Sequence, residues 1–210
     1  MSVLFVGNSL TYVAQLPEVF ASVCRVNERT CKHRTFARGG ATLTQWAEDG
    51  AVNAALAQKQ YDFVVLQERG GDLQGLFGPV AQRQAEAAAE ELVARARQAR
   101  TVPIILGTYQ QLPQASRALE ASERNLASQL DVAYVAVSES FRRGLQTNSD
   151  LRWLASDGMH PGPDLALMKA TLLYRTIFKH FPLHAAFNVG PIFYSAEVWT
   201  QVLGAASITR

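Results

Sequence analysis

The chain has 210 residues, of which 48% are hydrophobic and 18% are charged, and its formal net charge is +2 at pH 7. This length suits a single domain over residues 1–210 with a full hydrophobic core, and the composition excludes an intrinsically disordered chain. The basic residues are scattered and no run of about 18 apolar residues occurs, so we expect neither a nucleic-acid partner nor a membrane span.

The first predicted strand, residues 3–6, is an apolar run that stops at Gly7, Asn8 and Ser9. Such a turn has an ordinary explanation, because Ser9 or Thr11 can cap the helix that follows a strand. A sharper interpretation makes Ser9 a nucleophile at the carboxyl end of a parallel strand. The far end of the chain decides between these two interpretations.

Helix-like and strand-like segments alternate after this turn. Residues 15–27 have apolar side chains at helical spacing, and residues 61–67 contain an unbroken apolar run typical of a strand that is buried on both faces. The further expected strands are residues 32–37, 101–109 and 132–137. The further expected helices are 43–58 with a break near Gly50, 79–100, 116–130, 138–147 and the segment that begins at Pro163.

Five strands, each followed by a helix, predict one α/β domain whose parallel sheet is covered by helices on both faces. In such sheets, ligands bind outside the carboxyl ends of the strands. Ser9, Gly39, Gly40, Gln67 and Tyr109 all fall at these ends. This placement does not depend on any motif.

A second polar group lies in the glycine-rich segment before the last predicted helix. Asp157 and His160 are three residues apart, so a turn can bring the carboxylate to the imidazole. A serine hydroxyl needs a base to become a good nucleophile, and that base needs an orienting carboxylate. Ser9, His160 and Asp157 together therefore predict nucleophilic catalysis, although each motif alone is weak.

Three segments carry a resemblance to the SGNH hydrolases, the GDSL-type esterases and lipases. "VGNSLT" resembles the first block of that family, with Asn8 where aspartate is more usual, "ARGGATL" is similar to the second block, and "DGMHPG" resembles the last block. The resemblance implies a flavodoxin-like three-layer α/β/α fold with a five-stranded parallel sheet. It also implies Ser9 as nucleophile, His160 as base and Asp157 as the orienting residue, with no metal or organic cofactor.

The same resemblance implies an oxyanion hole that includes the backbone N–H groups of Ser9 and Gly40. The third block departs from the family, which has an asparagine in a Gly-x-Asn-Asp segment, because "QERGGD" contains none. Gln67 is the nearest chemical substitute and is preferred to Asp72. The alternative is that Gln67 only ends the strand and fixes the neighbouring loop.

The sequence defines the substrate only as a class, a small acyl ester or an acetylated carbohydrate. Trp46, Tyr109 and Met159 are candidate pocket residues, and Phe77 and Trp153 are further ones, although most such side chains belong to a core. The apolar C-terminal stretch 182–210 has three interpretations: it covers the sheet, caps the site or makes a homodimer contact. An acyltransferase that uses the same triad is an alternative within the hydrolase interpretation.

Two other function classes stay open. A binding module on the same fold would recognise an acylated or carbohydrate ligand without catalysis, and a flavodoxin-like protein would use "GNSLT" to bind a phosphate or nucleotide. Cys24 and Cys31 are too few for a disulfide framework, and the remaining histidines have no metal-ligand spacing. With no visible signal peptide, we expect a reduced, cytoplasmic protein.

Overall fold

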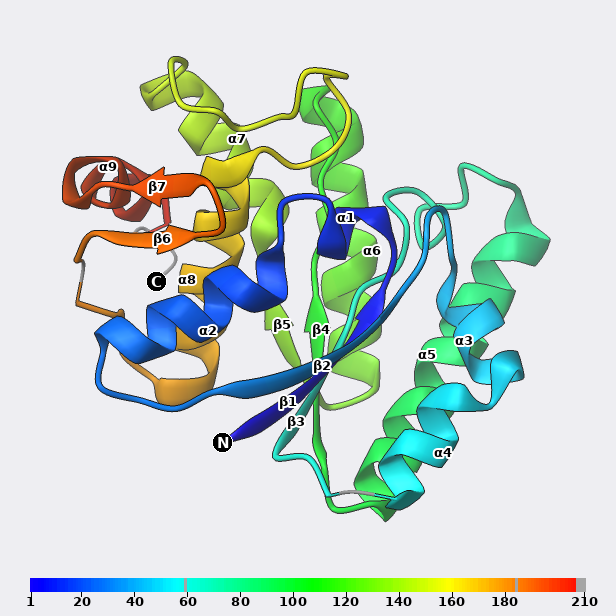
Figure 1. Ribbon diagram of the computed structural model, residues 1–210. Coiled ribbons are helices and arrows are strands. Elements are labelled where there is room, and N and C mark those ends of the chain that lie inside the picture. Colours follow the sequence, from blue (N-terminus) through cyan, green and yellow to red (C-terminus); the bar gives the residue numbers. More distant parts are fainter. Residues whose placement is uncertain (59, 184, 207–210) are drawn as a thin grey trace.

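The computed structural model describes residues 1–58, 60–183 and 185–206. Its centre is a five-stranded parallel sheet in the order β2-β1-β3-β4-β5, which is the flavodoxin-like order (Figure 1). The strands are β1 (Ser2–Gly7), β2 (Lys32–Ala37), β3 (Phe63–Leu66), β4 (Val102–Leu106) and β5 (Ala133–Val135). The α/β fold class with a parallel sheet of five strands is confirmed.

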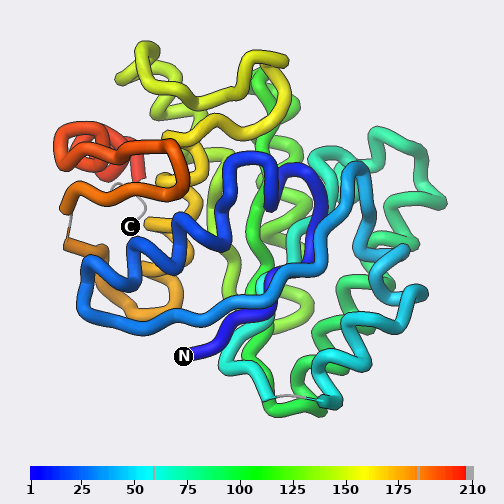
Figure 2. The backbone as a smooth tube through the Cα atoms, in the orientation of Figure 1, coloured from blue at the N-terminus to red at the C-terminus, as the bar shows by residue number. Residues whose placement is uncertain are grey.

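Helices cover both faces of this sheet. One layer contains α2 (Leu16–Val26), α7 (Val137–Thr147) and α8 (Pro163–Phe178). The opposite layer contains α3 (Leu43–Asp49), α4 (Ala51–Gln58), α5 (Pro79–Gln98) and the end of α6 (Pro113–Gln129). Figures 1 and 2 show α2 and α8 on one side of the strands and α3, α4 and α5 on the other.

The central strand β1 explains why the sheet is covered on both faces. Val3 and Phe5 belong to the apolar cluster under α2 and α8, while Leu4 and Val6 belong to the cluster under α3, α4 and α5. All four side chains are fully buried. Successive side chains of a strand point to opposite faces, so a strand buried on both faces needs a continuous apolar run.

The observed elements differ from the expected ones mainly at their ends. The short helix α1 (Ser9–Tyr12) follows β1 directly and was not predicted. The helix predicted over residues 43–58 is divided at Gly50, as expected, because this residue has the left-handed φ of 75° that glycine tolerates. Among the described residues, no helix is long and apolar enough to cross a bilayer.

The C-terminal stretch adds a hairpin and a helix outside the α2 and α8 layer (Figure 1). Strands β6 (Phe187–Val189) and β7 (Ile192–Tyr194) are antiparallel, and α9 (Ala196–Ala206) packs on α7 and α8. Trp199 is fully buried in the same apolar cluster. The stretch therefore covers the helical layer, while His184 and residues 207–210 lie outside the described residues.

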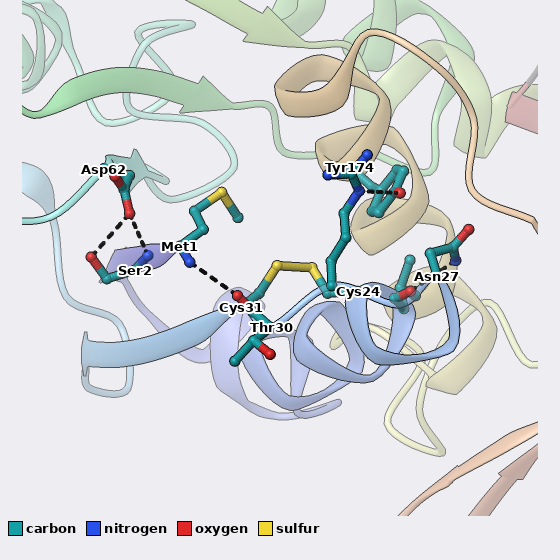
Figure 3. The surroundings of a disulfide bond; sticks show 10 residues. Met1, Ser2, Cys24, Asn27, Thr30, Cys31, Asp62 and Tyr174 are labelled. Carbon is teal, nitrogen blue, oxygen red and sulfur yellow. Dashed lines mark hydrogen bonds between the residues drawn. A yellow bond between two sulfur atoms is a disulfide. The ribbon is translucent and has the colours of Figure 1, made fainter.

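The prediction that both cysteines are reduced is wrong in this structure. Cys24, near the end of α2, and Cys31, just before β2, form a disulfide (Figure 3). Two cysteines are too few for a disulfide framework, but the turn after α2 brings the Cα atoms of this pair, seven residues apart, to 6.0 Å. That distance is within the usual range for a disulfide.

Removing this disulfide should lower stability without changing the fold. The double variant Cys24→Ser/Cys31→Ser is expected to lose about 2 kcal/mol of unfolding free energy, the loop-closure value for so short a loop. For a chain of this size the loss corresponds to a fall in melting temperature of about 4–8 °C. Thermal unfolding with and without a reductant measures it, and an equal melting temperature for both proteins would contradict the bond.

Candidate active site

The turn after β1 places Ser9 two residues beyond the end of the strand. Asn8 is the N-cap of α1, and its Oδ1 accepts a hydrogen bond from the Leu10 N–H at 3.0 Å. A Cβ atom at Gly7 would lie 2.2 Å from Thr11 Oγ1, so a side chain there would displace the buried Thr11 hydroxyl. Asn8 therefore caps the helix, and Ser9 occupies the first helical position.

The Asn8 side chain also fixes this turn to its neighbours. Its Nδ2 donates to Ala41 O at 3.2 Å and to Gln67 O at 3.4 Å. These acceptors lie beyond β2 and β3, the two strands that flank β1. Asn8 is 1% exposed, so these bonds are shielded from water and hold three strand ends together.

Asp157 and His160 form the pair that their spacing predicts. His160 Nδ1 lies 2.6 Å from Asp157 Oδ2, and Asp157 Oδ1 accepts the backbone N–H groups of Met159 and His160 at 2.9 Å each. The hydrogen bond from the His160 ring, followed by the two backbone bonds, lowers the pKa of Asp157 to about 2. The carboxylate is therefore ionised at neutral pH and holds the imidazole through Nδ1, which leaves Nε2 free for a substrate or nucleophile.

The loop that carries this pair is anchored to the start of α8. Leu154 and Pro161 form an isolated antiparallel bridge, and the Gly162 N–H donates to Trp153 O at 2.8 Å. Asp164, in the first turn of α8, accepts the Arg152 N–H at 2.6 Å and pairs with its guanidinium at 3.0 Å. The segment before the loop, at residues 152–154, is therefore held to the segment after it, at residues 161–164.

A cavity of about 660 Å³ lies at the carboxyl ends of the strands, and Ser9, Gly40 and His160 all contribute to its lining. This volume is in the usual range for a small-molecule site. Gly40, not Gly39, lines the cavity; it has a φ of 67°, and a Cβ there would meet no atom within 4 Å. The structure therefore brings Ser9 and His160, which are 151 residues apart in the sequence, to one cavity.

Gln67 does not lie in this cavity lining, which disagrees with its predicted role as an oxyanion donor. It is 1% exposed, and its Nε2 donates to Gly107 O at 3.1 Å. Its Oε1 accepts from Thr11 Oγ1 at 2.8 Å and from Lys169 Nζ at 3.3 Å. The Gln67 amide fixes the neighbouring segments, which was the alternative interpretation.

Arg69 lines the cavity and was not predicted from the sequence. Its Nε and Nη2 donate to the two carboxylate oxygens of Asp72 at 2.9 and 2.7 Å, and its guanidinium lies over the Phe77 ring at 4.4 Å. The hydrogen bonds that Arg69 donates to Asp72 raise the pKa of Arg69. The available signal was the Arg-x-x-Asp spacing in the loop directly after β3.

Glu68 holds the start of α3 next to this loop. It is 3% exposed, and its carboxylate accepts the N–H groups of Leu43 at 3.0 Å and Arg69 at 2.8 Å. Burial raises the pKa of Glu68 to about 7. Glu68 therefore joins the segments that follow β2 and β3, and it is not one of the residues that line the cavity.

The candidate pocket residues divide into two groups. Tyr109 and Met159 line the cavity, and the Tyr109 hydroxyl donates to Met159 O at 2.8 Å. Trp46 does not line it: this side chain is 5% exposed, lies in the core, and donates to Gly7 O at 2.7 Å. Trp153 is likewise a core residue, at 2% exposed. Within the described part of the chain, no cluster of three His, Cys, Asp or Glu residues could hold a metal ion.

Comparison with known proteins finds this fold in a solved structure of an SGNH hydrolase. No protein-family model and no curated protein matches the sequence. A solved structure assigned to the SGNH hydrolases, from Slackia heliotrinireducens, is 26% identical with a TM-score of 0.69, and the match covers 84% of this chain and 98% of that one.

Two further solved structures match with lower sequence identity. A DUF4886 family protein from Bacteroides uniformis is 14% identical with a TM-score of 0.76, covering 100% of this chain and 97% of that one. An acetylxylan esterase from Geobacillus stearothermophilus is 17% identical with a TM-score of 0.63, covering 84% and 93%. At these identities the likeness shows the fold alone.

Proposed function

We propose that this chain, which has the fold of the SGNH hydrolases, hydrolyses carboxylic esters through Ser9, His160 and Asp157. The observation that carries the proposal is the 2.6 Å contact between His160 and Asp157 beside a cavity that Ser9 also lines. A serine, an imidazole and an ionised carboxylate are the groups that acyl transfer by an activated serine requires.

In the proposed reaction, Ser9 Oγ attacks the ester carbonyl while His160 Nε2 takes its proton. Asp157 keeps the other ring nitrogen protonated and stabilises the imidazolium that forms. His160 then protonates the departing alcohol, which leaves an acyl group on Ser9. Water attacks this acyl-enzyme by the same proton transfers and releases the acid.

Negative charge on the carbonyl oxygen needs donors that are already in place. The first N–H groups of a helix have no intrahelical acceptor, so the Ser9 N–H at the start of α1 is suited to this task. The Gly40 N–H is the second donor that we propose, because Gly40 lines the same cavity from the loop after β2. Loss of one such donor typically costs about 10²–10³ in kcat.

The substrate class that we propose is a small acyl ester or an acetylated carbohydrate. The cavity volume supports a small ligand, and one structural neighbour is named as an acetylxylan esterase. The chemistry proposed here requires no metal or organic cofactor.

Labelling by an activated phosphonate tests the proposal. We expect one phosphonyl group per chain, located on Ser9 by peptide mass spectrometry, and release of p-nitrophenol from p-nitrophenyl acetate that stops when labelling is complete. A protein that is labelled elsewhere, or that hydrolyses neither p-nitrophenyl esters nor acetylated xylose, would contradict the proposal. A binding module without catalysis would give neither label nor product.

A further inference from the structure

A buried lysine lies directly beneath the turn that carries Ser9. Lys169, in the middle of α8, has an exposed fraction of 0%. Its Nζ donates to Leu10 O at 2.6 Å and to Gln67 Oε1 at 3.3 Å. The lysine of one helical layer therefore reaches the polar ends of the strands.

Such a position is costly for an amine. Burial lowers the pKa of Lys169 to about 7, and Glu123 opposes this shift only in part. The two hydrogen-bond acceptors of Lys169 are neutral oxygens rather than carboxylates. An apolar side chain of similar volume often packs at such a site with equal or better stability, so the contribution of Lys169 to stability does not explain its presence.

The hydrogen-bond acceptors of Lys169 give a better explanation for a lysine at this buried position. Helix α1 has only four residues, too few to be stable without tertiary contacts. Leu10 O is one of the carbonyl oxygens that so short a helix leaves without an internal partner, and Lys169 satisfies it. Gln67 Oε1 also accepts from Thr11 Oγ1 at 2.8 Å, so Lys169 and Gln67 hold two consecutive residues after Ser9.

The helix that carries Lys169 also follows the loop of the Asp157–His160 pair. That loop is anchored to the first turn of α8 through Asp164 and Arg152. Lys169 lies five positions beyond Asp164 on the same helix. One rigid helix thus contacts both the Ser9 turn and the segment that holds the base.

We propose that Lys169 is a positioning residue, which fixes the Ser9 turn relative to His160 by tying Leu10 and Gln67 to α8. This inference rests on the proposed esterase function. Displacement of a nucleophile by about 1 Å can cost about 10² in rate, so loss of this contact should act on the chemical step rather than on binding.

The variant Lys169→Met separates positioning from packing. We expect it to fold with a melting temperature within about 4 °C of the parent's, because removal of the buried amine offsets the loss of the hydrogen bond to Leu10 O. We expect kcat for p-nitrophenyl acetate to fall by about 10–100-fold with KM within twofold, and the rate of phosphonate labelling at Ser9 to fall by a similar factor. A purely structural role would give the opposite pattern, with lower stability and an unchanged kcat.

Two further variants complete the test. Met168→Leu, at the neighbouring buried position on α8, is the matched control and should keep both kcat and labelling rate. Lys169→Gln is a second neutral variant and should also lose kcat, since its shorter side chain does not reach Leu10 O.

The outcomes distinguish this inference from the proposed function. If the parent is active and a folded Lys169 variant keeps kcat within twofold, the positioning role is overturned and the esterase stands. If neither Lys169→Met nor Lys169→Gln folds, Lys169 is a structural residue and the inference is again overturned. If the parent shows neither ester hydrolysis nor Ser9 labelling, the proposed function fails and this inference fails with it.

Discussion

Ser9→Ala is expected to lower kcat for p-nitrophenyl acetate by at least about 10⁴-fold, because a methyl group cannot form the acyl-enzyme. Stability should change by no more than about 0.5 kcal/mol, since Asn8 rather than Ser9 caps α1. Steady-state hydrolysis with p-nitrophenyl acetate measures the first quantity, and thermal unfolding measures the second. Residual activity reflects only attack by water within the cavity.

A matched control makes this result specific to position 9. Ser122, a partly exposed serine on α6, donates to Ala118 O and lies outside the cavity lining, so Ser122→Ala should keep the parent rate. If Ser9→Ala hydrolyses the ester as fast as Ser122→Ala does, Ser9 is not the nucleophile. An activated phosphonate should likewise label Ser122→Ala and leave Ser9→Ala unlabelled.

The sheet could be predicted from the sequence because parallel strands buried on both faces have a distinctive pattern. Residues 61–67 contain an unbroken apolar run, and β3 coincides with it at Phe63–Leu66. The weaker pattern of residues 32–37 reflects an edge strand, since β2 has only β1 as a neighbour in the sheet. The short helix α1 could not be predicted, because four residues contain no periodicity.

The Asp157–His160 pair could be predicted because its geometry is local. Three residues separate Asp157 from His160, and one turn is enough to join them. Ser9 could be predicted only by combining this pair with the turn after β1. That step relied on the rule that strand carboxyl ends converge, together with the family resemblance.

The positions of the residues after β3 could not be predicted from the sequence. The Gln67 N–H donates to Val6 O at 2.9 Å, so the strand pairing continues for one residue beyond β3. Val65 and Leu66 face opposite helical layers, and continued alternation turns Gln67 toward α8 and Lys169. Arg69 then reaches the cavity because the chain has left the strand, and no pattern in the sequence specifies where that departure begins.

The wrong or missing predictions for Trp46 and Lys169 have a common physical cause. The sequence does not reveal which hydrogen-bond acceptor a buried side chain will find. Trp46 was a candidate pocket residue, but its indole N–H donates to Gly7 O, two residues before Ser9. Lys169 lay within a helix whose other side chains are mostly apolar, and its burial was not expected. In both cases a polar atom on a core side chain satisfies a backbone carbonyl near Ser9.

Asp157→Asn has the second large expected effect, and it tests the arrangement of the site rather than the identity of the nucleophile. The carboxamide keeps the size of the side chain but cannot stabilise an imidazolium, and it allows the wrong tautomer of His160. We expect kcat for p-nitrophenyl acetate to fall by about 10⁴-fold, with KM little changed.

The pH dependence sharpens this prediction. Because its hydrogen bonds lower the pKa of Asp157 to about 2, the carboxylate stays ionised as the pH falls until that value is approached. Loss of activity between pH 5 and pH 4 in the parent would therefore not come from protonation of Asp157. Asp150→Asn is the matched control, since Asp150 is an exposed residue earlier in the same connection whose side chain accepts a hydrogen bond from Ser149. Equal rates for Asp157→Asn and Asp150→Asn would remove Asp157 from the mechanism and leave His160 without its orienting partner.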